Sequence, residues 1–149
     1  MVRLKHRYLL TEVVFADGKV NPSTKWGDVL TAVKDSILAV HGDYGYSCAV
    51  SSLQIKYFNA YTRIMLLRVS RDHYEMVWSA ITFLTSLNHR ECLCRVIHLG
   101  GTIRSCQKQL LKYQQKALKA MVAEATTPVE RKQMAALLEE ATKIALAVD

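Results

Sequence analysis

The chain has 149 residues, of which half are hydrophobic and only two are proline, and it carries a formal net charge of +7. This length fits one domain, and the composition excludes a disordered chain and favours a packed α/β or α+β domain. Apolar runs are too short to cross a bilayer and no secretory signal is visible, so we expect a soluble intracellular protein with four reduced cysteines.

The N-terminal part predicts a strand followed by a helix. Residues 5–15 are rich in β-forming side chains, and a turn follows at Asp17-Gly18. The next pattern predicts a helix from an N-cap at Ser23 to about Val40, with Gly42 as its C-terminal cap. Its buried face is expected to carry Trp26, Val29, Leu30, Val33 and Ile37.

The middle of the chain predicts a hairpin and a second helix. Strands are expected at residues 46–57 and 62–69, with the turn between them at residues 58–61. A helix is then expected from a cap at Ser70 to about Leu87. Its buried stripe is expected to contain Tyr74, Val77, Trp78, Ile81 and Leu84.

The C-terminal part predicts one more strand and two helices. Residues 92–99 form the strand, which ends at the pair Gly100-Gly101. Helices follow near residues 102–124 and 128–147, and the run Thr127-Pro128-Val129-Glu130 predicts an N-cap, an N1 proline and a capping box for the second of them.

The order β-α-β-β-α-β predicts an α+β, ferredoxin-like (RRM-like) sandwich with two extra C-terminal helices. We expect a domain at residues 1–124, including the basic third helix, and a helical extension at residues 125–149. The first and third strands are apolar on both alternating faces, which is typical of strands covered on both sides. The first two helices would cover one face, and an added helix or a partner protein the other.

Basic residues are concentrated in two stretches. Residues 1–11 contain Arg3, Lys5 and Arg7 without an acid, and residues 92–123 contain six basic residues without an acid. A clustered surplus of this kind indicates a surface that binds a polyanion. For the N-terminal row alone, an edge strand protected from aggregation is an equally good interpretation.

The segment from His98 to Arg104 combines two glycines with the start of the third helix. Glycines allow a close backbone approach, and a helix start offers free N–H groups to a phosphate. Helical spacing places Arg104, Lys108, Lys112, Lys116 and Lys119 within one arc, opposite Ile103, Cys106, Leu110, Tyr113, Ala117 and Met121. This basic ladder is about 20 Å long and suits a nucleic-acid backbone, although an ordinary solvated amphipathic helix would show the same spacing.

Other site chemistry finds little support. His89, Cys92, Cys94 and His98 have zinc-like residue types, but on a strand Cys92 and His98 would lie about 20 Å apart, too far for one ion. No nucleotide-binding or nucleophile motif is present, and a set of Cys106, His98 and Asp72 has no supporting spacing. The third strand lacks the Gly/aromatic pattern with which RRM domains stack bases. Tyr57, Phe58 and Tyr61 at the hairpin could stack a base, but core or rim packing is the favoured interpretation.

Several blocks together resemble one known family. The segments VRLKHRYLL at 2–10, HG at 41–42, YFNAYTRIMLLR at 57–68, VWSAITFL at 77–84 and HLGGTIRSCQK at 98–108 resemble, in the same order, the Pop-five subunits of ribonuclease P and ribonuclease MRP. The resemblance runs from residue 2 to about residue 113. Residues 114–149 share only their helical character.

The resemblance implies a non-catalytic, RNA-binding subunit of an RNA-based endoribonuclease. The RNA of such particles removes 5′ leaders from precursor tRNA with magnesium held by the RNA, the protein holding no cofactor, and the MRP particle processes precursor rRNA. Partners would be the ribonuclease P or MRP RNA, precursor tRNA and other protein subunits, including a TIM-barrel-like one, in the nucleus and nucleolus. RNA contacts would come from Arg3, Lys5, Arg7, His98, Gly100, Gly101, Thr102, Arg104 and Lys108, and the ladder adds Lys112 and Lys116. The alternatives are a general ferredoxin-like RNA-binding or ribosome-associated module and a small acylphosphatase-like hydrolase.

Overall fold

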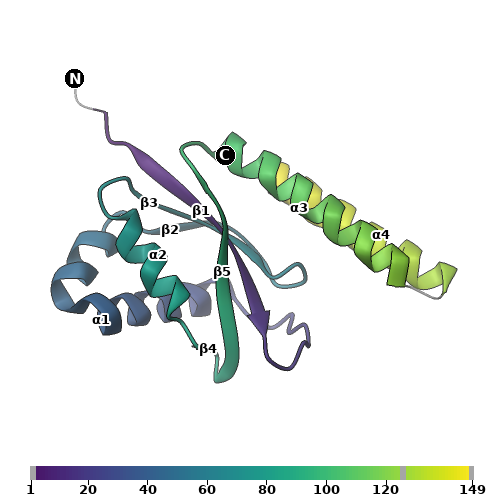
Figure 1. Cartoon of the computed structure of the whole chain (residues 1–149), viewed down its shortest axis with the longest axis horizontal. Helices are drawn as coiled ribbons and strands as arrows, with labels where there is room; N and C mark the ends of the chain where they lie inside the picture. The colour runs from purple at the N-terminus through teal and green to yellow at the C-terminus, as the bar shows by residue number, and fades with distance from the viewer. Residues whose placement is uncertain (1–2, 125–126, 148–149) are drawn as a thin grey trace.

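The computed structural model describes residues 3–124 and 127–147. Its elements are β1 (His6–Phe15), α1 (Trp26–Val50), β2 (Gln54–Asn59), β3 (Ile64–Ser70), α2 (Tyr74–Thr82), β4 (Ser86–Leu87), β5 (Arg90–Gly100), α3 (Ile103–Glu124) and α4 (Pro128–Leu146). The strands follow the order β2-β3-β1-β5-β4, and every paired strand is antiparallel to its neighbour. Figure 1 shows α1 and α2 on one side of the sheet and the pair α3 and α4 on the other. The predicted ferredoxin-like sandwich with two added helices is confirmed, with the two-residue β4 as an addition.

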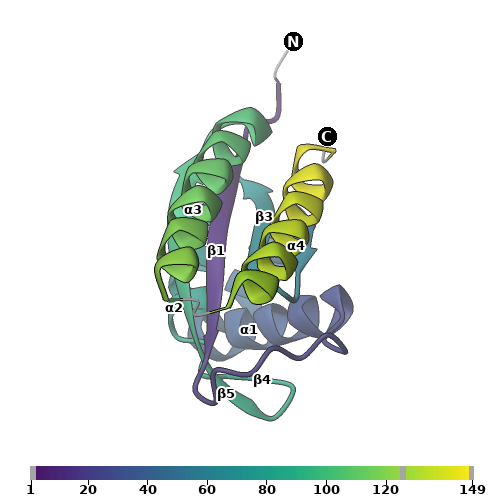
Figure 2. The same ribbon diagram turned by 90° about the vertical axis from the view of Figure 1, so that its right-hand side faces the viewer.

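Both faces of the sheet are buried, because neighbouring residues of the central strands enter different cores. Leu9 of β1 pairs with Leu67 of β3, and both contribute to the core beneath α1 and α2. Leu10 pairs with Leu66, and this pair packs on the opposite face against Leu110 of α3. The prediction that an added helix covers the second face is confirmed (Figure 2).

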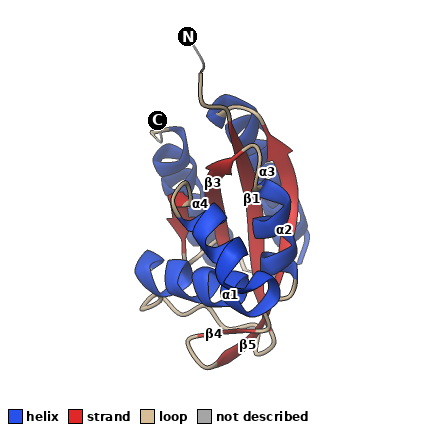
Figure 3. Cartoon of the chain, turned by 90° about the vertical axis from the view of Figure 1, so that its left-hand side faces the viewer, coloured by secondary structure: helices blue, strands red, loops and turns tan. Residues whose placement is uncertain are grey.

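Helix α1 is longer than the sequence predicted. Gly42 has φ 68° and ψ −166°, a conformation that glycine adopts readily, but the helix resumes beyond it instead of ending. The second half is held against α2, since the His41 ring lies 3.0 Å from Met76 O and Ala49 is fully buried. Tertiary packing therefore converts residues 46–50, predicted as strand, into helix, and β2 begins only at Gln54. Figure 3 shows α1 and α2 together in front of the sheet.

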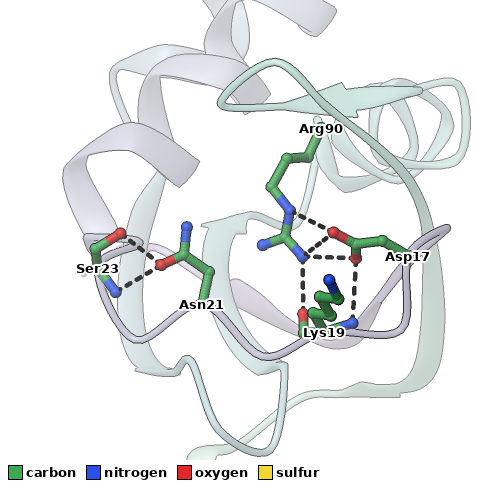
Figure 4. A network of polar contacts seen from close by, with 5 residues as sticks. All are labelled: Asp17, Lys19, Asn21, Ser23 and Arg90. Carbon is green, nitrogen blue, oxygen red and sulfur yellow. Dashed lines mark hydrogen bonds and ion pairs between the residues drawn. The ribbon is translucent and has the colours of Figure 1, made fainter.

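Two tryptophans and two helix starts differ from the prediction. Trp26 is 62% exposed and Trp78 is 37% exposed, so neither belongs to the buried stripe predicted for its helix. Helix α1 begins after Lys25, because Ser23 instead bonds the side chain of Asn21 (Figure 4). Ser70 ends β3, and the N-cap of α2 is His73, three residues after the predicted cap. Helix α2 ends at Thr82, well short of Leu87.

The β4–β5 hairpin replaces the last turn of the predicted second helix. Its turn residues Asn88 and His89 have φ of 50° and 60°, a pair of positive values typical of tight hairpin turns. Arg90, the first residue of β5, donates to both carboxylate oxygens of Asp17 and to Lys19 O (Figure 4). Its guanidinium also lies 4.1 Å from the centre of the Phe15 ring. The hydrogen bond from Arg90 is the main cause that lowers the pKa of Asp17. This network joins the loop after β1 to the hairpin.

The two C-terminal helices form an antiparallel pair that lies against the sheet (Figures 1 and 2). Ala141 of α4 is buried, and its carbonyl accepts a hydrogen bond from the Tyr57 hydroxyl of β2 at 3.4 Å. Thr127 and Pro128 hold the predicted N-cap and N1 positions, but the cap side chain makes no hydrogen bond, so the predicted capping box is absent from this described helix start. No helix in the described ranges is long and apolar enough to cross a membrane.

Candidate nucleic-acid interface

The two basic stretches meet at one end of the molecule. Segment 3–8 runs beside the β5–α3 junction and the first turn of α3 (Figure 2). Together these segments line an open groove of about 890 Å³. The groove is lined by Arg3, Leu4, Lys5, His6, Arg7, Tyr8, Gly101, Thr102, Ile103, Arg104, Gln107 and Leu146. No acidic residue is among these lining residues of the described chain. A groove with four Arg or Lys side chains and no carboxylate favours an anionic ligand.

The start of α3 is oriented by its own cap. Thr102 immediately precedes α3, and its Oγ1 accepts a hydrogen bond from the Ser105 N–H at 3.2 Å. The Ser105 hydroxyl also contacts the His98 ring at 3.2 Å, so His98 lies behind the cap and does not line the groove. Ile103 and Arg104 are the first two residues of α3, so their N–H groups have no carbonyl acceptor within the helix. The helix dipole is positive at this end. The geometry suits a phosphate placed in the groove.

The two glycines at the junction have different surroundings. A Cβ on Gly100 would lie 2.6 Å from Cys106 Sγ, so this glycine allows α3 to pack closely against the end of β5. A Cβ on Gly101 would meet only Arg7 Nη1, at 3.8 Å, which is ordinary contact. Gly100 is therefore explained by packing, whereas Gly101 lines the groove and leaves its backbone accessible.

The basic ladder continues from the groove along α3. Arg104, Lys108, Lys112, Lys116 and Lys119 are all exposed, and none of them forms an ion pair within the described part of the chain. On the opposite side, Cys106 and Leu110 are buried against the sheet. The predicted division of α3 into a packed face and a basic face is confirmed; the side chain of Met121 lies outside the described residues.

Six predicted site residues line the groove, and the others have separate places. Lys108, Lys112 and Lys116 extend the basic surface along α3, while His98 and Gly100 support the junction from behind. Arg3 and Lys5 lie before β1 in the N-terminal segment, so only Arg7 of that row belongs to a strand.

Six lining residues lie outside the predicted site set: Leu4, His6, Tyr8, Ile103, Gln107 and Leu146. Tyr8 and His6 belong to the same N-terminal block as the basic row, and Gln107 lies one turn from Ile103, so local spacing could have identified them. Leu146 reaches the groove only because α4 folds back along α3, and no local sequence signal encodes that.

Three other kinds of site chemistry find no support in the described structure. Helices α3 and α4 cover the sheet face that RRM domains use for base stacking, so the nucleic acid cannot lie there. Cys106 is buried, and burial raises the pKa of its thiol to about 11, so at neutral pH it is not a thiolate nucleophile. Within the described residues, no three His, Cys, Asp or Glu side chains are grouped to hold a metal ion.

Comparison with known proteins gives a consistent family. The model of the Rpp14/Pop5 family matches residues 7–111. The ribonuclease P/MRP protein subunit POP5 of Bos taurus is 41% identical over 135 residues, which cover 88% of this chain and 79% of that protein. The POP5 subunit of Homo sapiens is 39% identical and covers 88% and 83%, and that of Saccharomyces cerevisiae is 27% identical and covers 79% and 80%. A chain from the cryo-EM structure of yeast ribonuclease MRP has the same fold, with a TM-score of 0.57 at 9% identity over 80% of this chain and 98% of that chain.

Proposed function

Since the chain belongs to the Rpp14/Pop5 family, we infer that it is an RNA-binding protein subunit of the ribonuclease P and ribonuclease MRP ribonucleoproteins. In ribonuclease P it supports RNA-catalysed removal of 5′ leaders from precursor tRNA. In ribonuclease MRP it supports the processing of precursor rRNA.

The observation that carries this proposal is the groove between the N-terminal segment and the start of α3. Arg3, Lys5 and Arg7 lie nearly a hundred residues before Arg104 in the sequence, and the fold brings all four to one acid-free depression. The basic ladder on α3, which forms no ion pair with the residues that the structure describes, leads away from the groove. A row of separate cations that continues beyond the groove matches the repeated phosphates of an RNA backbone better than a single small anion.

We propose that the protein acts as a scaffold and that the RNA performs the cleavage with magnesium that the RNA holds. The neutral, buried thiol of Cys106 and the use of His98 to brace Ser105 support this role over hydrolysis by the protein. RNA-free protein incubated with precursor tRNA and magnesium should release no 5′ leader. As a control, the protein is first treated with ribonuclease, and the ribonuclease is then removed before the substrate is added. Specific 5′ cleavage that persists after this treatment and scales with protein concentration would overturn the scaffold role.

We further propose that the protein works in the nucleus and nucleolus.

We also propose that other protein subunits of the particle, including a TIM-barrel-like one, bind away from the groove. Support for protein partners comes from large apolar side chains that the fold leaves exposed. Trp26 is 62% exposed, while Phe83 and Val129 are each 66% exposed. Addition of the copurifying subunits should raise the melting temperature of the chain by mass action, and an unchanged value would count against a direct contact.

Copurification tests the assignment to the particles. A tagged chain expressed in its own cells should recover ribonuclease P RNA, MRP RNA or both, together with a fixed set of protein subunits. A general RNA-binding module would instead recover many RNAs in proportion to their abundance. Sequencing of the recovered RNA separates the two outcomes, and a broad mixture would refute the assignment.

A further inference from the structure

A second basic cluster lies on the other side of the N-terminal segment from the groove. Here β3 presents Arg68, which pairs with Tyr8 of β1 and with Gln54 of β2. A depression of about 350 Å³ opens beside it, and its lining includes Lys5, His6, Ser51, Ser52, Arg68 and His73. None of its described lining residues is acidic. Leu4, Lys5 and His6 line both this depression and the groove, so the two surfaces are continuous.

Arg68 is a cation without a carboxylate. Its Nη1 donates to Gln54 Oε1 at 3.2 Å, and its Nη2 lies 2.9 Å from His6 Nε2. Within the described chain it forms no ion pair, and its Nε is buried with no hydrogen-bond partner. Buried donors are nearly always satisfied, so this N–H lacks an acceptor, and one could reach it only after a neighbouring side chain moves. The Nε–Nη2 edge of arginine is the fork that matches two phosphate oxygens.

His6 responds to the same surroundings. Arginine can only donate hydrogen bonds, so the ring nitrogen that faces Arg68 must be unprotonated. Burial is the main cause that lowers the pKa of His6, and the charges of Arg68 and Lys56 lower it further. The other titratable residues that line the depression are Lys5, Cys48 of α1 and His73 just before α2, and no aspartate or glutamate is among its described lining residues. An anion that enters here would favour the protonated ring and so oppose the effects of burial and of the two positive charges.

We propose that this depression, the Arg68 subsite (Lys5, His6, Gln54 and Arg68), binds a further phosphate of the RNA backbone, so that the bound strand crosses the N-terminal segment from the groove. In the bound state the His6 ring turns from Arg68 Nη2, takes a proton from solvent and donates to the phosphate, while the Nε–Nη2 edge of Arg68 donates to two of its oxygens. The inference rests on the proposed function and extends its RNA contacts to residues outside the two basic stretches.

The salt dependence of RNA binding tests the subsite. The probe is ribonuclease P RNA from the same cells, transcribed in vitro, and the affinity of the full chain is measured by fluorescence anisotropy over a range of salt concentrations. Arg68→Gln should reduce the log–log salt slope by about 0.7–0.9, the value for one lost phosphate contact. Arg68→Lys should recover most of the slope. The matched control is Arg71→Gln, which removes one charge from a residue that pairs with Asp72 and does not line the depression, and should leave the slope unchanged.

A pH series provides an arm that does not depend on Arg68. Wild type should gain affinity relative to His6→Gln as pH falls from about 7.5 to about 6, by up to about tenfold per pH unit for one proton taken up. The glutamine retains a side-chain oxygen that can accept from Arg68, so this variant decides the question if Arg68→Gln does not fold. Parallel pH curves, or equal slopes for folded Arg68→Gln and Arg71→Gln, would overturn the subsite while the RNA-binding function stands. Binding by wild type without salt dependence would overturn both.

Discussion

Replacement of Arg104, Lys108 and Lys112 by alanine should weaken RNA binding through the loss of three phosphate contacts. Each side chain is exposed and lacks an ion pair in the described part of the chain, so each is available to the RNA. If every contact forms, the log–log salt slope falls by about 2–3 units, at about 0.7–0.9 for each phosphate. Between 50 and 200 mM salt, the wild type should then lose about 20- to 40-fold more affinity than the variant.

The same triple replacement should leave the fold intact. Exposed charges away from packed features change stability by less than about 0.5 kcal/mol each. Arg104, Lys108 and Lys112 are also like charges at i, i+4 spacing, which cost a helix about 0.2–0.5 kcal/mol per pair, and alanine is a better helix former than either residue. We therefore expect an equal or slightly higher melting temperature, measured by circular dichroism.

The matched control changes an equal number of basic residues away from the groove. Lys19, Lys34 and Arg71 line neither the groove nor the Arg68 subsite, so their replacement by alanine alters net charge equally and should reduce the slope far less. If the folded α3 variant and this control have the same slope, the ladder is an ordinary solvated helix face and the reasoning is refuted.

Three further outcomes follow from the packing. Gly100→Ala should lower the unfolding midpoint, because its Cβ would lie 2.6 Å from Cys106 Sγ and overpacking costs about 1–3 kcal/mol. Gly101→Ala should unfold like wild type yet bind RNA less tightly. Equal unfolding midpoints for the two variants would contradict this difference. Leu110→Ala should cost about 2–5 kcal/mol in urea unfolding, because it empties part of the core between the sheet and α3, and a cost near zero would mean that α3 is dispensable to the fold. Because the pKa of His6 is lowered in the folded protein, the unfolded chain binds more protons than the folded chain as pH falls below about 6.5. The contribution of His6 to the free energy of unfolding is therefore fully present above that pH and declines below it. In His6→Gln the free energy of unfolding should decline less with falling pH. Parallel curves of unfolding free energy against pH for wild type and this variant would exclude the effect of His6.

Local sequence patterns predicted the structure correctly where a single physical reason explains why a residue type occupies its position. The alternating apolar residues around Leu9 and Leu10 predicted a strand buried on both faces, and the spacing from Arg104 to Lys119 predicted a helix with one basic side. Gly42 misled because a glycine with positive φ ends many helices, while here contacts between His41 and α2 continue the helix past it. Trp26 misled because helical spacing gives the direction of a side chain but not the edge of the layer that would cover it.

For the site, the amino-acid sequence by itself determined the two acid-free basic stretches, the glycine junction, the division of α3 and the resemblance to the family. These properties depend on residue type and short-range spacing, which the chain carries before it folds. Only the tertiary structure decided that the two basic stretches face one groove, that Gly100 serves packing while Gly101 lines the groove, and that Arg68 stands beside His6 without a carboxylate. The physical reason is that antiparallel pairing of β1 with both β3 and β5 brings residues far apart in sequence into contact, and no local pattern specifies which unpaired charges will then become neighbours.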